Sequence, residues 1–297
     1  MDSKQIGASP GFTFAYYQLD STIDNFLWSL DSLAQLGYEN FGLETLEPEH
    51  TRLYWENDGI HRLLQRAEIR GIRFTSFTIW HCVTALCSCD SATRSLGVKR
   101  FAEGVEIAKR LGIELVTIGS DWPSEWVTEY RPEYQHGPAG SYFIPSSREY
   151  EQTWCGYVDA IGECLEIACR NNQRLAVEPR ANSLIATADG FLRMWDRFRA
   201  VELGCGLDVM HCSFQRESVP VAIQKLGPQL AVFQVSGTDG TTLHHLPLSS
   251  ADETLRASIA ALRATGFTGP VDVELYGMPV ETVNEAYRRA REVLLAL

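Results

Sequence analysis

Four short apolar segments in the second half of the chain each carry an oxygen-bearing polar side chain at or near their end. Each segment is typical of a buried parallel strand, and a stretch with helical spacing separates it from the next. Burying several carboxylates at one edge of a sheet is costly without a cation. The pattern therefore predicts a divalent-cation site whose ligands are carboxylate and carboxamide oxygens. The four polar residues are Glu178, Asp208, Gln234 and Glu274.

Further side chains that could contact a substrate lie close to predicted strand ends. His211 stands three residues after Asp208, about one helical turn. We expect it to bind a substrate oxygen or a metal-bound water, or to act as an acid. Arg180 stands two residues after Glu178 and is expected either to bind a substrate anion or to pair with that carboxylate. The other substrate-binding candidates, for which a purely structural role stays open, are Glu44, His81, Trp122 and His245.

Composition restricts the classes of protein that the chain can belong to. With 45% hydrophobic and 22% charged residues it has the makeup of a soluble globular protein. A net charge of −12 disfavours nucleic acid as a partner. The N-terminus has no signal-peptide pattern and no segment is apolar enough to span a membrane. Eight cysteines without a Cys-x-x-Cys pair are typical of free thiols, so we expect a cytoplasmic protein without a membrane partner.

Strand-like and helix-like segments alternate along the whole chain. Strands are predicted at 11–17, 41–45, 72–79 and 115–118, ahead of the four segments described above. Helices are predicted between them, and Gly37, Gly71, Gly112 and Gly266 follow predicted helix ends, where glycine is common. Eight strand–helix pairs predict an α/β fold, a single (β/α)8 TIM barrel over residues 1–297. The first strand lacks the Gly-x-Gly-x-x-Gly that a dinucleotide-binding sheet carries.

One connection is much longer than the others. Residues from about 120 to 147 are rich in aromatic residues, Gly and Pro and show no clear periodicity. Loops of this length inside a compact domain are usually lids or binding loops. The aromatic rings could stack on the C–H faces of a sugar or on a planar aglycone, or they could pack the loop onto the barrel. They are Trp122, Trp126, Tyr130, Tyr134 and Tyr142.

At these residues the chain resembles the xylose isomerase-like TIM barrel superfamily of sugar and sugar phosphate isomerases and epimerases. That family has Glu on strand five, Asp-x-x-His on strand six, His on strand seven and Glu on strand eight. The segments 177–179, 207–211 and 273–275 match three of these positions with Glu178, Asp208 with His211, and Glu274. Gln234 departs from the pattern, because it stands where the family has its metal-binding histidine.

The resemblance implies one divalent ion held by Glu178, Asp208, Gln234 and Glu274. A carboxamide oxygen is a hard ligand, so Gln234 shifts the expected metal from zinc toward manganese, with magnesium or cobalt as alternatives. Gln at this position also resembles the 3-dehydroshikimate dehydratases of the superfamily. The zinc-dependent nucleases of the superfamily fit poorly, because this chain has few histidines near strand ends and a strong negative charge.

The implied chemistry is removal of a proton from a carbon next to a carbonyl, through an enediolate. Glu178 and Glu274, assisted by His211, would remove and return the proton, which gives a metal-dependent isomerase or epimerase of a sugar-like hydroxy ketone. A leaving group β to the carbanion would give a lyase instead, either a dehydratase or an enzyme that eliminates from an oxidised glycoside. A silent barrel that binds metal or polyol is the third alternative. The sequence leaves open whether a homo-oligomer or a partner subunit is involved.

Overall fold

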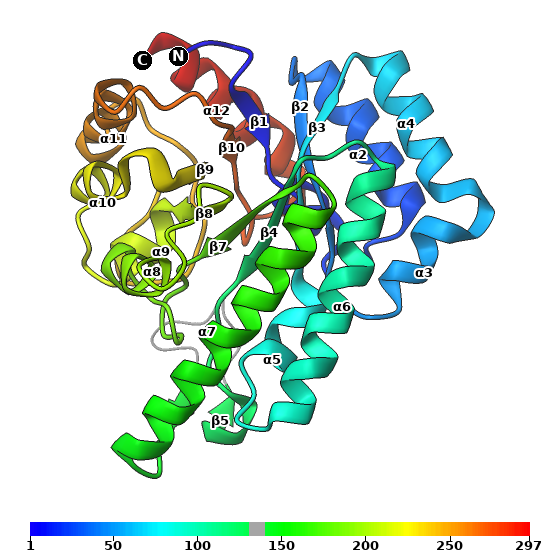
Figure 1. Cartoon of the computed structure of the whole chain (residues 1–297). Coiled ribbons are helices and arrows are strands. Elements are labelled where there is room, and N and C mark those ends of the chain that lie inside the picture. The colour runs from blue at the N-terminus through cyan, green and yellow to red at the C-terminus, as the bar shows by residue number, and fades with distance from the viewer. Residues whose placement is uncertain (131–139) are drawn as a thin grey trace.

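In a computed structural model that describes residues 1–130 and 140–297, eight parallel strands close into a barrel surrounded by helices (Figure 1). The order around the barrel is β1-β10-β9-β8-β7-β4-β3-β2, so strands adjacent along the chain are adjacent in the barrel. This confirms the predicted TIM barrel. The barrel strands are β1 (Ile6–Ala8), β2 (Asn40–Thr45), β3 (Arg73–Ile79), β4 (Leu115–Gly119), β7 (Arg174–Glu178), β8 (Leu203–Asp208), β9 (Leu230–Val235) and β10 (Val271–Val273).

The helices cover the outside of the barrel, and their buried faces pack against the strands. They are α1 (Gly11–Tyr17), α2 (Ile23–Gln35), α3 (His50–Trp55), α4 (Gly59–Arg70), α5 (Val83–Leu86), α6 (Ser91–Arg110), α7 (Ser147–Arg170), α8 (Ala188–Trp195), α9 (Val209–Phe214), α10 (Val219–Leu226), α11 (Glu253–Ala264) and α12 (Val283–Ala296). The longer helices α2, α4, α6, α7, α8, α10, α11 and α12 lie within a few residues of the helical patterns in the sequence, whereas α1, α3, α5 and α9 were not predicted as helices.

Local side-chain chemistry fixes many of the helix ends. The side chains of Thr22, Asp90 and Ser146 accept hydrogen bonds from backbone N–H groups in the first turns of α2, α6 and α7. Such caps satisfy donors that have no partner inside the helix. At the other end, Gly112 after α6 has φ +72, a left-handed conformation that glycine adopts without a steric penalty. The helix signals in the sequence were therefore reliable guides to the helix ends.

The first strand is where the sequence prediction was wrong. The segment 11–17 forms helix α1, and the first barrel strand is Ile6–Ala8, only three residues long. The aromatic residues that suggested a strand follow helical spacing: the rings of Phe12 and Tyr16 lie 5.4 Å apart, centroid to centroid, on one face of α1. Phe12 is fully buried against Tyr287 of α12, so packing between helices outweighs the β propensity of the segment.

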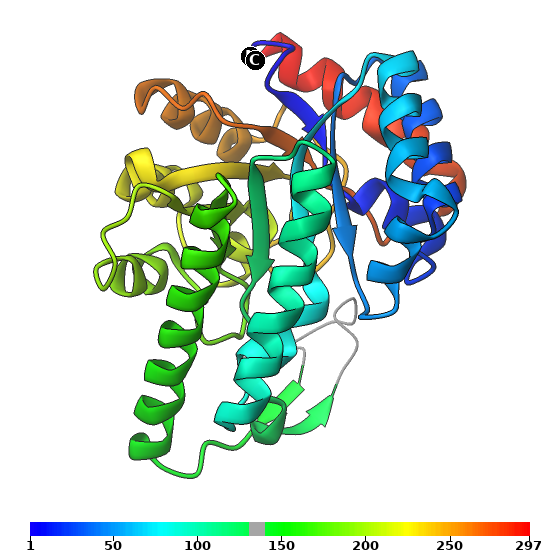
Figure 2. The same cartoon turned by 45° about the vertical axis from the view of Figure 1, so that its right-hand side comes forward.

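The long aromatic connection contains two strands of its own, β5 (Val127–Tyr130) and β6 (Gly140–Tyr142), which pair in antiparallel fashion. Figures 1 and 2 show this pair at the end of the molecule opposite the two chain termini. Strands β4 and β7 run toward the same end, so the hairpin lies on the side of the barrel where catalytic residues of TIM barrels stand. Residue Tyr134, one of the aromatic candidates, lies outside the described residues.

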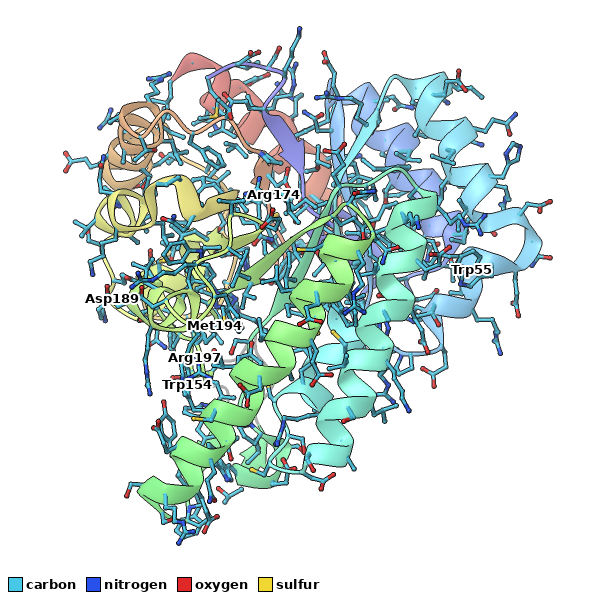
Figure 3. All side chains as sticks on the ribbon, in the orientation of Figure 1. Trp55, Trp154, Arg174, Asp189, Met194 and Arg197 are labelled. Atoms are coloured by element: carbon cyan, nitrogen blue, oxygen red, sulfur yellow. The ribbon has the colours of Figure 1, made fainter. Side chains whose placement is uncertain are left out.

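Outside the barrel the helices contact one another through mixed apolar and charged side chains. Between α7 and α8 the guanidinium of Arg193 lies 4.3 Å from the ring centroid of Trp154, which is labelled in Figure 3.

All eight cysteines are free, as the missing Cys-x-x-Cys pair predicted. Within the described residues, every helix is either too short or too polar to cross a membrane.

Candidate metal centre and active site

A cavity of about 550 Å³ opens at the carboxyl end of the barrel strands. The sheet register places Asp208, the last residue of β8, beside Gln234 of β9, and Gln234 in turn beside Asp272 of β10. Glu274 stands two residues beyond Asp272, so both point to the same face of the strand, the inside of the barrel. The acidic and imidazole side chains that line the cavity are Glu44, Glu178, His211, His245 and Glu274.

Asp208 is held by hydrogen bonds to both of its oxygens. Its Oδ1 accepts from the backbone N–H groups of Met210 (2.5 Å) and His211 (3.2 Å), which makes it the N-cap of α9. Its Oδ2 lies 3.0 Å from Nε2 of His245. Burial alone would raise the pKa of Asp208, but the two histidines outweigh it and hold that pKa below its usual value. Asp208 is therefore a fixed, ionised carboxylate at the centre of the site.

His211 lies in α9, directly after β8, and its side chain contacts residues at and just beyond the end of β7. Its Nδ1 accepts a hydrogen bond from the backbone N–H of Ala181 (3.3 Å), so in the neutral ring the proton sits on Nε2. That nitrogen lies 3.3 Å from Oε1 of Glu178. Both side chains are buried. The Asp-x-x-His spacing thus places the imidazole of His211 where it can donate a hydrogen bond to Glu178 of β7.

Glu274 and Gln234 form a second, half-buried pair. The side-chain amide nitrogen of Gln234 donates to Oε2 of Glu274 at 2.5 Å. Burial raises the pKa of Glu274 well above its usual value, and the negative charges of Asp208 and Glu178 raise it further. Three carboxylates this close cannot all be ionised cheaply unless a positive charge joins them.

The donor set fits a divalent ion. Glu178, Asp208 and His211 bring one ligand atom each within 4.8 Å of one another, and so do Asp208, His245 and Glu274. Asp208 belongs to both groups. Within the described residues, Nδ1 of the fully buried His245 has no hydrogen-bond partner, which is costly for a polar atom unless a ligand uses it. Carboxylates with one or two imidazoles are donors that manganese and zinc both accept.

Glu44, Trp80 and Arg180 form one wall of the cavity. Nε1 of Trp80 donates to Oε2 of Glu44 (3.1 Å), and the guanidinium of Arg180 lies 5.0 Å from the Trp80 ring centroid. Oε1 of Glu44 is buried and has no partner among the described residues. Burial raises the pKa of Glu44 to about 8, although the Trp80 hydrogen bond opposes this. Glu44 can therefore meet a substrate hydroxyl in its protonated form.

Two candidates for substrate binding lie away from the cavity lining that the structure describes. His81 is buried, with Nδ1 2.7 Å from Oγ1 of Thr45 and Nε2 3.0 Å from the carbonyl oxygen of Arg100. Both ring nitrogens are engaged by protein atoms, so the geometry gives His81 a structural role. Trp122 packs against Trp126 and Tyr142, with ring centroids 5.9 and 5.5 Å apart. The Trp122 ring thus holds the long connection together.

His245 reaches the centre from a connecting segment, which sequence reasoning did not anticipate. It was expected only to touch substrate, yet it lies against Asp208 among the candidate ligands. Two isolated antiparallel bridges, Gly237 with Leu246 and His245 with Tyr276, fold this segment back over the strand ends. The Tyr276 ring lies 4.1 Å from the His245 ring, centroid to centroid. Hydrophobic periodicity carries no signal for such a fold-back; the adjacent His244 and His245 were the available hint.

Comparisons with known proteins agree with this architecture. No curated protein matches the chain by sequence. Among solved structures, a D-psicose 3-epimerase is 17% identical, with a TM-score of 0.74 and 98% and 97% of the two chains covered. A 3-keto-D-glucoside 4-epimerase from E. coli is 14% identical, with a TM-score of 0.74 and 99% of each chain covered.

The IolI protein with a bound zinc atom is 17% identical to the chain, with a TM-score of 0.70 and 98% and 97% of the two chains covered. At these identities the three structures demonstrate a shared fold. The sequence model of a family described as "Xylose isomerase-like TIM barrel" matches residues 30–297. The chain therefore belongs to the xylose isomerase-like TIM barrel family.

Proposed function

We propose that the chain is a divalent-metal-dependent isomerase or epimerase of a sugar or sugar-like hydroxy ketone. The observation that carries the proposal is the pair Glu178 and Glu274, which line one cavity from β7 and from the end of β10. Two carboxylates on different sides of a bound substrate are what proton removal and return require. The fold neighbours that are sugar epimerases support the same reaction class.

The metal would be held by Glu178, Asp208 and Glu274, with His245 as a fourth donor. Gln234 remains a predicted ligand. Rotation of its carboxamide would exchange the positions of the nitrogen and the oxygen, so that the oxygen could face an ion bound beside Glu274. Manganese is the metal we expect, and three carboxylates agree with that preference, although an imidazole donor also suits zinc. When bound, a divalent ion would supply positive charge next to the substrate oxygens on which negative charge develops.

The protein groups perform the proton transfers. In the proposed reaction one glutamate takes the proton from the carbon beside the carbonyl, and the C–H electrons move toward the carbonyl oxygen to give an enediolate. The second glutamate, protonated at the start, gives its proton to the opposite face, which inverts that carbon and leaves the first glutamate protonated and the second ionised. His211 holds Glu178 in place through its Nε2. Glu44 and Arg180 would bind substrate oxygens on the cavity wall.

A lyase is the second candidate, because a glutamine at the position of Gln234 resembles the 3-dehydroshikimate dehydratases of the family. The first step is the same, and a leaving group β to the carbanion then departs in place of reprotonation. His211 or Glu44 would protonate that group. The silent metal-binding barrel, the cytoplasmic location, and a homo-oligomer or partner subunit also stay predictions.

Incubation with candidate ketoses in heavy water tests these alternatives. The protein is loaded with manganese, and the sugars are followed by NMR and mass spectrometry. An epimerase incorporates deuterium at one carbon and yields an isomer of the same formula. A lyase loses water or an aglycone. If no ketose exchanges a proton and none changes, the barrel is silent and the proposed reaction is wrong.

A further inference from the structure

One side of the cavity is built from a single face of helix α1. Gly11, Phe14, Ala15 and Gln18 all line the cavity, and their spacing of three and four residues puts them in one row along the helix. The row begins at the carboxylate centre, because a Cβ added to Gly11 would lie 3.1 Å from Cγ of Glu274. It ends at Gln18, which is exposed. Helix α1 therefore leads from the reacting centre to the mouth of the cavity.

Toward the mouth most of the lining is apolar, although the polar side chain of Gln18 also lies there. The side chains of Phe14 and Ala15 are joined there by Leu19, Leu46 and Met278. Leu19 is 59% exposed, so its apolar surface is in contact with solvent when the cavity is empty. We name this set of five residues the apolar arm. The ionisable lining residues, by contrast, come from the strand ends and the segments that follow them.

The side of the cavity that α1 lines is longer than a single sugar ring needs. Six residues of α1 lie between Gly11 and the C-cap Gln18, and the seven steps from one to the other correspond to a rise of about 10 Å at about 1.5 Å per residue. The cavity volume of about 550 Å³ falls in the range of about 300–1,000 Å³ found for pockets that bury drug-sized ligands. A free monosaccharide seated at the carboxylates would leave the arm to water.

The arm also suits neither a phosphate nor a second sugar. Buried hydroxyl and phosphate oxygens need hydrogen-bond donors or charges. The five residues of the arm offer no polar side chain, and the amide of Gln18 beside them is exposed to solvent. Arg180, the guanidinium among the described lining residues, lies over Trp80 on another wall. An apolar group is what the arm can bury with a gain in free energy.

From this arrangement we infer that the substrate is an oxidised glycoside, a keto-sugar that carries an apolar aglycone, with the sugar at the carboxylates and the aglycone along the apolar arm. The inference rests on the proposed function for the sugar end and goes beyond it for the rest of the substrate. A free ketose or a sugar phosphate would leave part of this surface unused.

A matched pair of probes isolates the contribution of the aglycone. Methyl and phenyl 3-keto-β-D-glucoside share their sugar and differ in the size of the apolar group. We expect the phenyl compound to bind about tenfold more tightly or better, in line with the burial of a ring of that size. Calorimetry on the chelator-treated protein measures this without turnover, and KM with manganese present provides the second readout.

Two variants locate the effect. Ala15→Trp would fill the arm and remove the advantage of the phenyl over the methyl compound. Ala92→Trp, at an exposed position of α6, is the control and should change neither affinity. Equal affinity for both probes in the unaltered protein would overturn the inference, and so would a phenyl preference that survives Ala15→Trp.

The failure of the inference and the failure of the proposed function can be told apart. If a free ketose is epimerised and the two glucosides bind equally, the reaction class stands and the apolar arm has another use. If the phenyl compound binds tightly but no ketose or keto-glycoside exchanges a proton in heavy water, the arm is a binding site and the proposed chemistry is wrong.

Discussion

Nε2 of His245 lies 3.0 Å from Oδ2 of Asp208, and both side chains are buried. Asp208 ends strand β8, whereas His245 comes from the segment that follows β9. In the pattern of the family, a histidine occupies the strand position at which this chain has Gln234. The Gln234 side chain donates a hydrogen bond to Glu274. The imidazole at the candidate metal centre thus comes from a connecting segment, and the strand supplies a carboxamide. Variants of His245 and Gln234 can test which of the two side chains binds the metal.

His245→Ala should weaken manganese binding more than Gln234→Ala does. His245 brings a nitrogen within 4.8 Å of the oxygens of Asp208 and Glu274, while Gln234 contacts Glu274 through a hydrogen bond. We expect a loss of more than about 100-fold for His245→Ala and at most about 10–100-fold for Gln234→Ala, as for residues that orient a ligand. Elemental analysis after dialysis and competition with a chelator measure both values.

The control for this pair is His61→Ala, since His61 is exposed on α4. A reversed order, with Gln234→Ala losing the metal and His245→Ala keeping it, would show that Gln234 rather than His245 is the ligand. In that case Gln234→His should also raise the preference for zinc over manganese, because it would add a nitrogen ligand.

Glu178→Gln and Glu274→Gln should each lower kcat by about 10²–10⁴-fold, the usual contribution of a positioned acid or base. Because the two glutamates enter the cavity from different strands, each variant should retain proton exchange from one epimer only. NMR in heavy water, started separately from each epimer, measures this. Loss of exchange from both epimers with metal content unchanged would mean that one glutamate performs both transfers.

The sequence predicted the barrel because its signals are local. Glycines after helices and buried strand runs each act within a few residues, and most of the barrel follows them closely. The first strand escaped because three residues, Ile6–Ala8, are too few to show a period. The position of His245 could not be predicted, since it depends on bridges between segments that are distant along the chain.

Glu44 should make the stability of the metal-free protein depend on pH. Its pKa is raised to about 8 from 4.5 in the folded state, so the folded protein holds a proton that the unfolded chain releases. Its contribution to stability is therefore fully present below pH about 4.5 and is lost as the pH rises toward about 8. Urea unfolding across this window should show a steeper fall for the unaltered protein than for Glu44→Gln.

Glu68→Gln, at an exposed position of α4, serves as the control for Glu44→Gln and should leave the pH dependence unchanged. Other buried acids, such as Asp272, contribute in the same direction, because burial also raises the pKa of Asp272, to about 7. The test is thus how steeply the free energy of unfolding falls with pH in the unaltered protein compared with Glu44→Gln. Equal slopes for Glu44→Gln and the unaltered protein would show that Glu44 titrates as it does in the unfolded chain.

Gly119 should not tolerate a side chain, because Trp80 packs over it. A Cβ at this position would lie 2.3 Å from Cζ3 of Trp80 and 2.8 Å from Cδ of Arg180. The indole would have to move, and its hydrogen bond to Glu44 would be disturbed. We expect Gly119→Ala to lower the free energy of unfolding by about 1–3 kcal/mol, the usual cost of overpacking, and to weaken substrate binding at this wall.

A double-mutant cycle separates the Trp80 clash from other effects of Gly119→Ala. Trp80→Ala removes the ring, so Gly119→Ala should cost much less in that background than in the unaltered protein. Urea unfolding of the four proteins gives the interaction free energy directly. A cost that is the same in both backgrounds would show that Arg180 or the backbone of β4, rather than Trp80, requires glycine at this strand end.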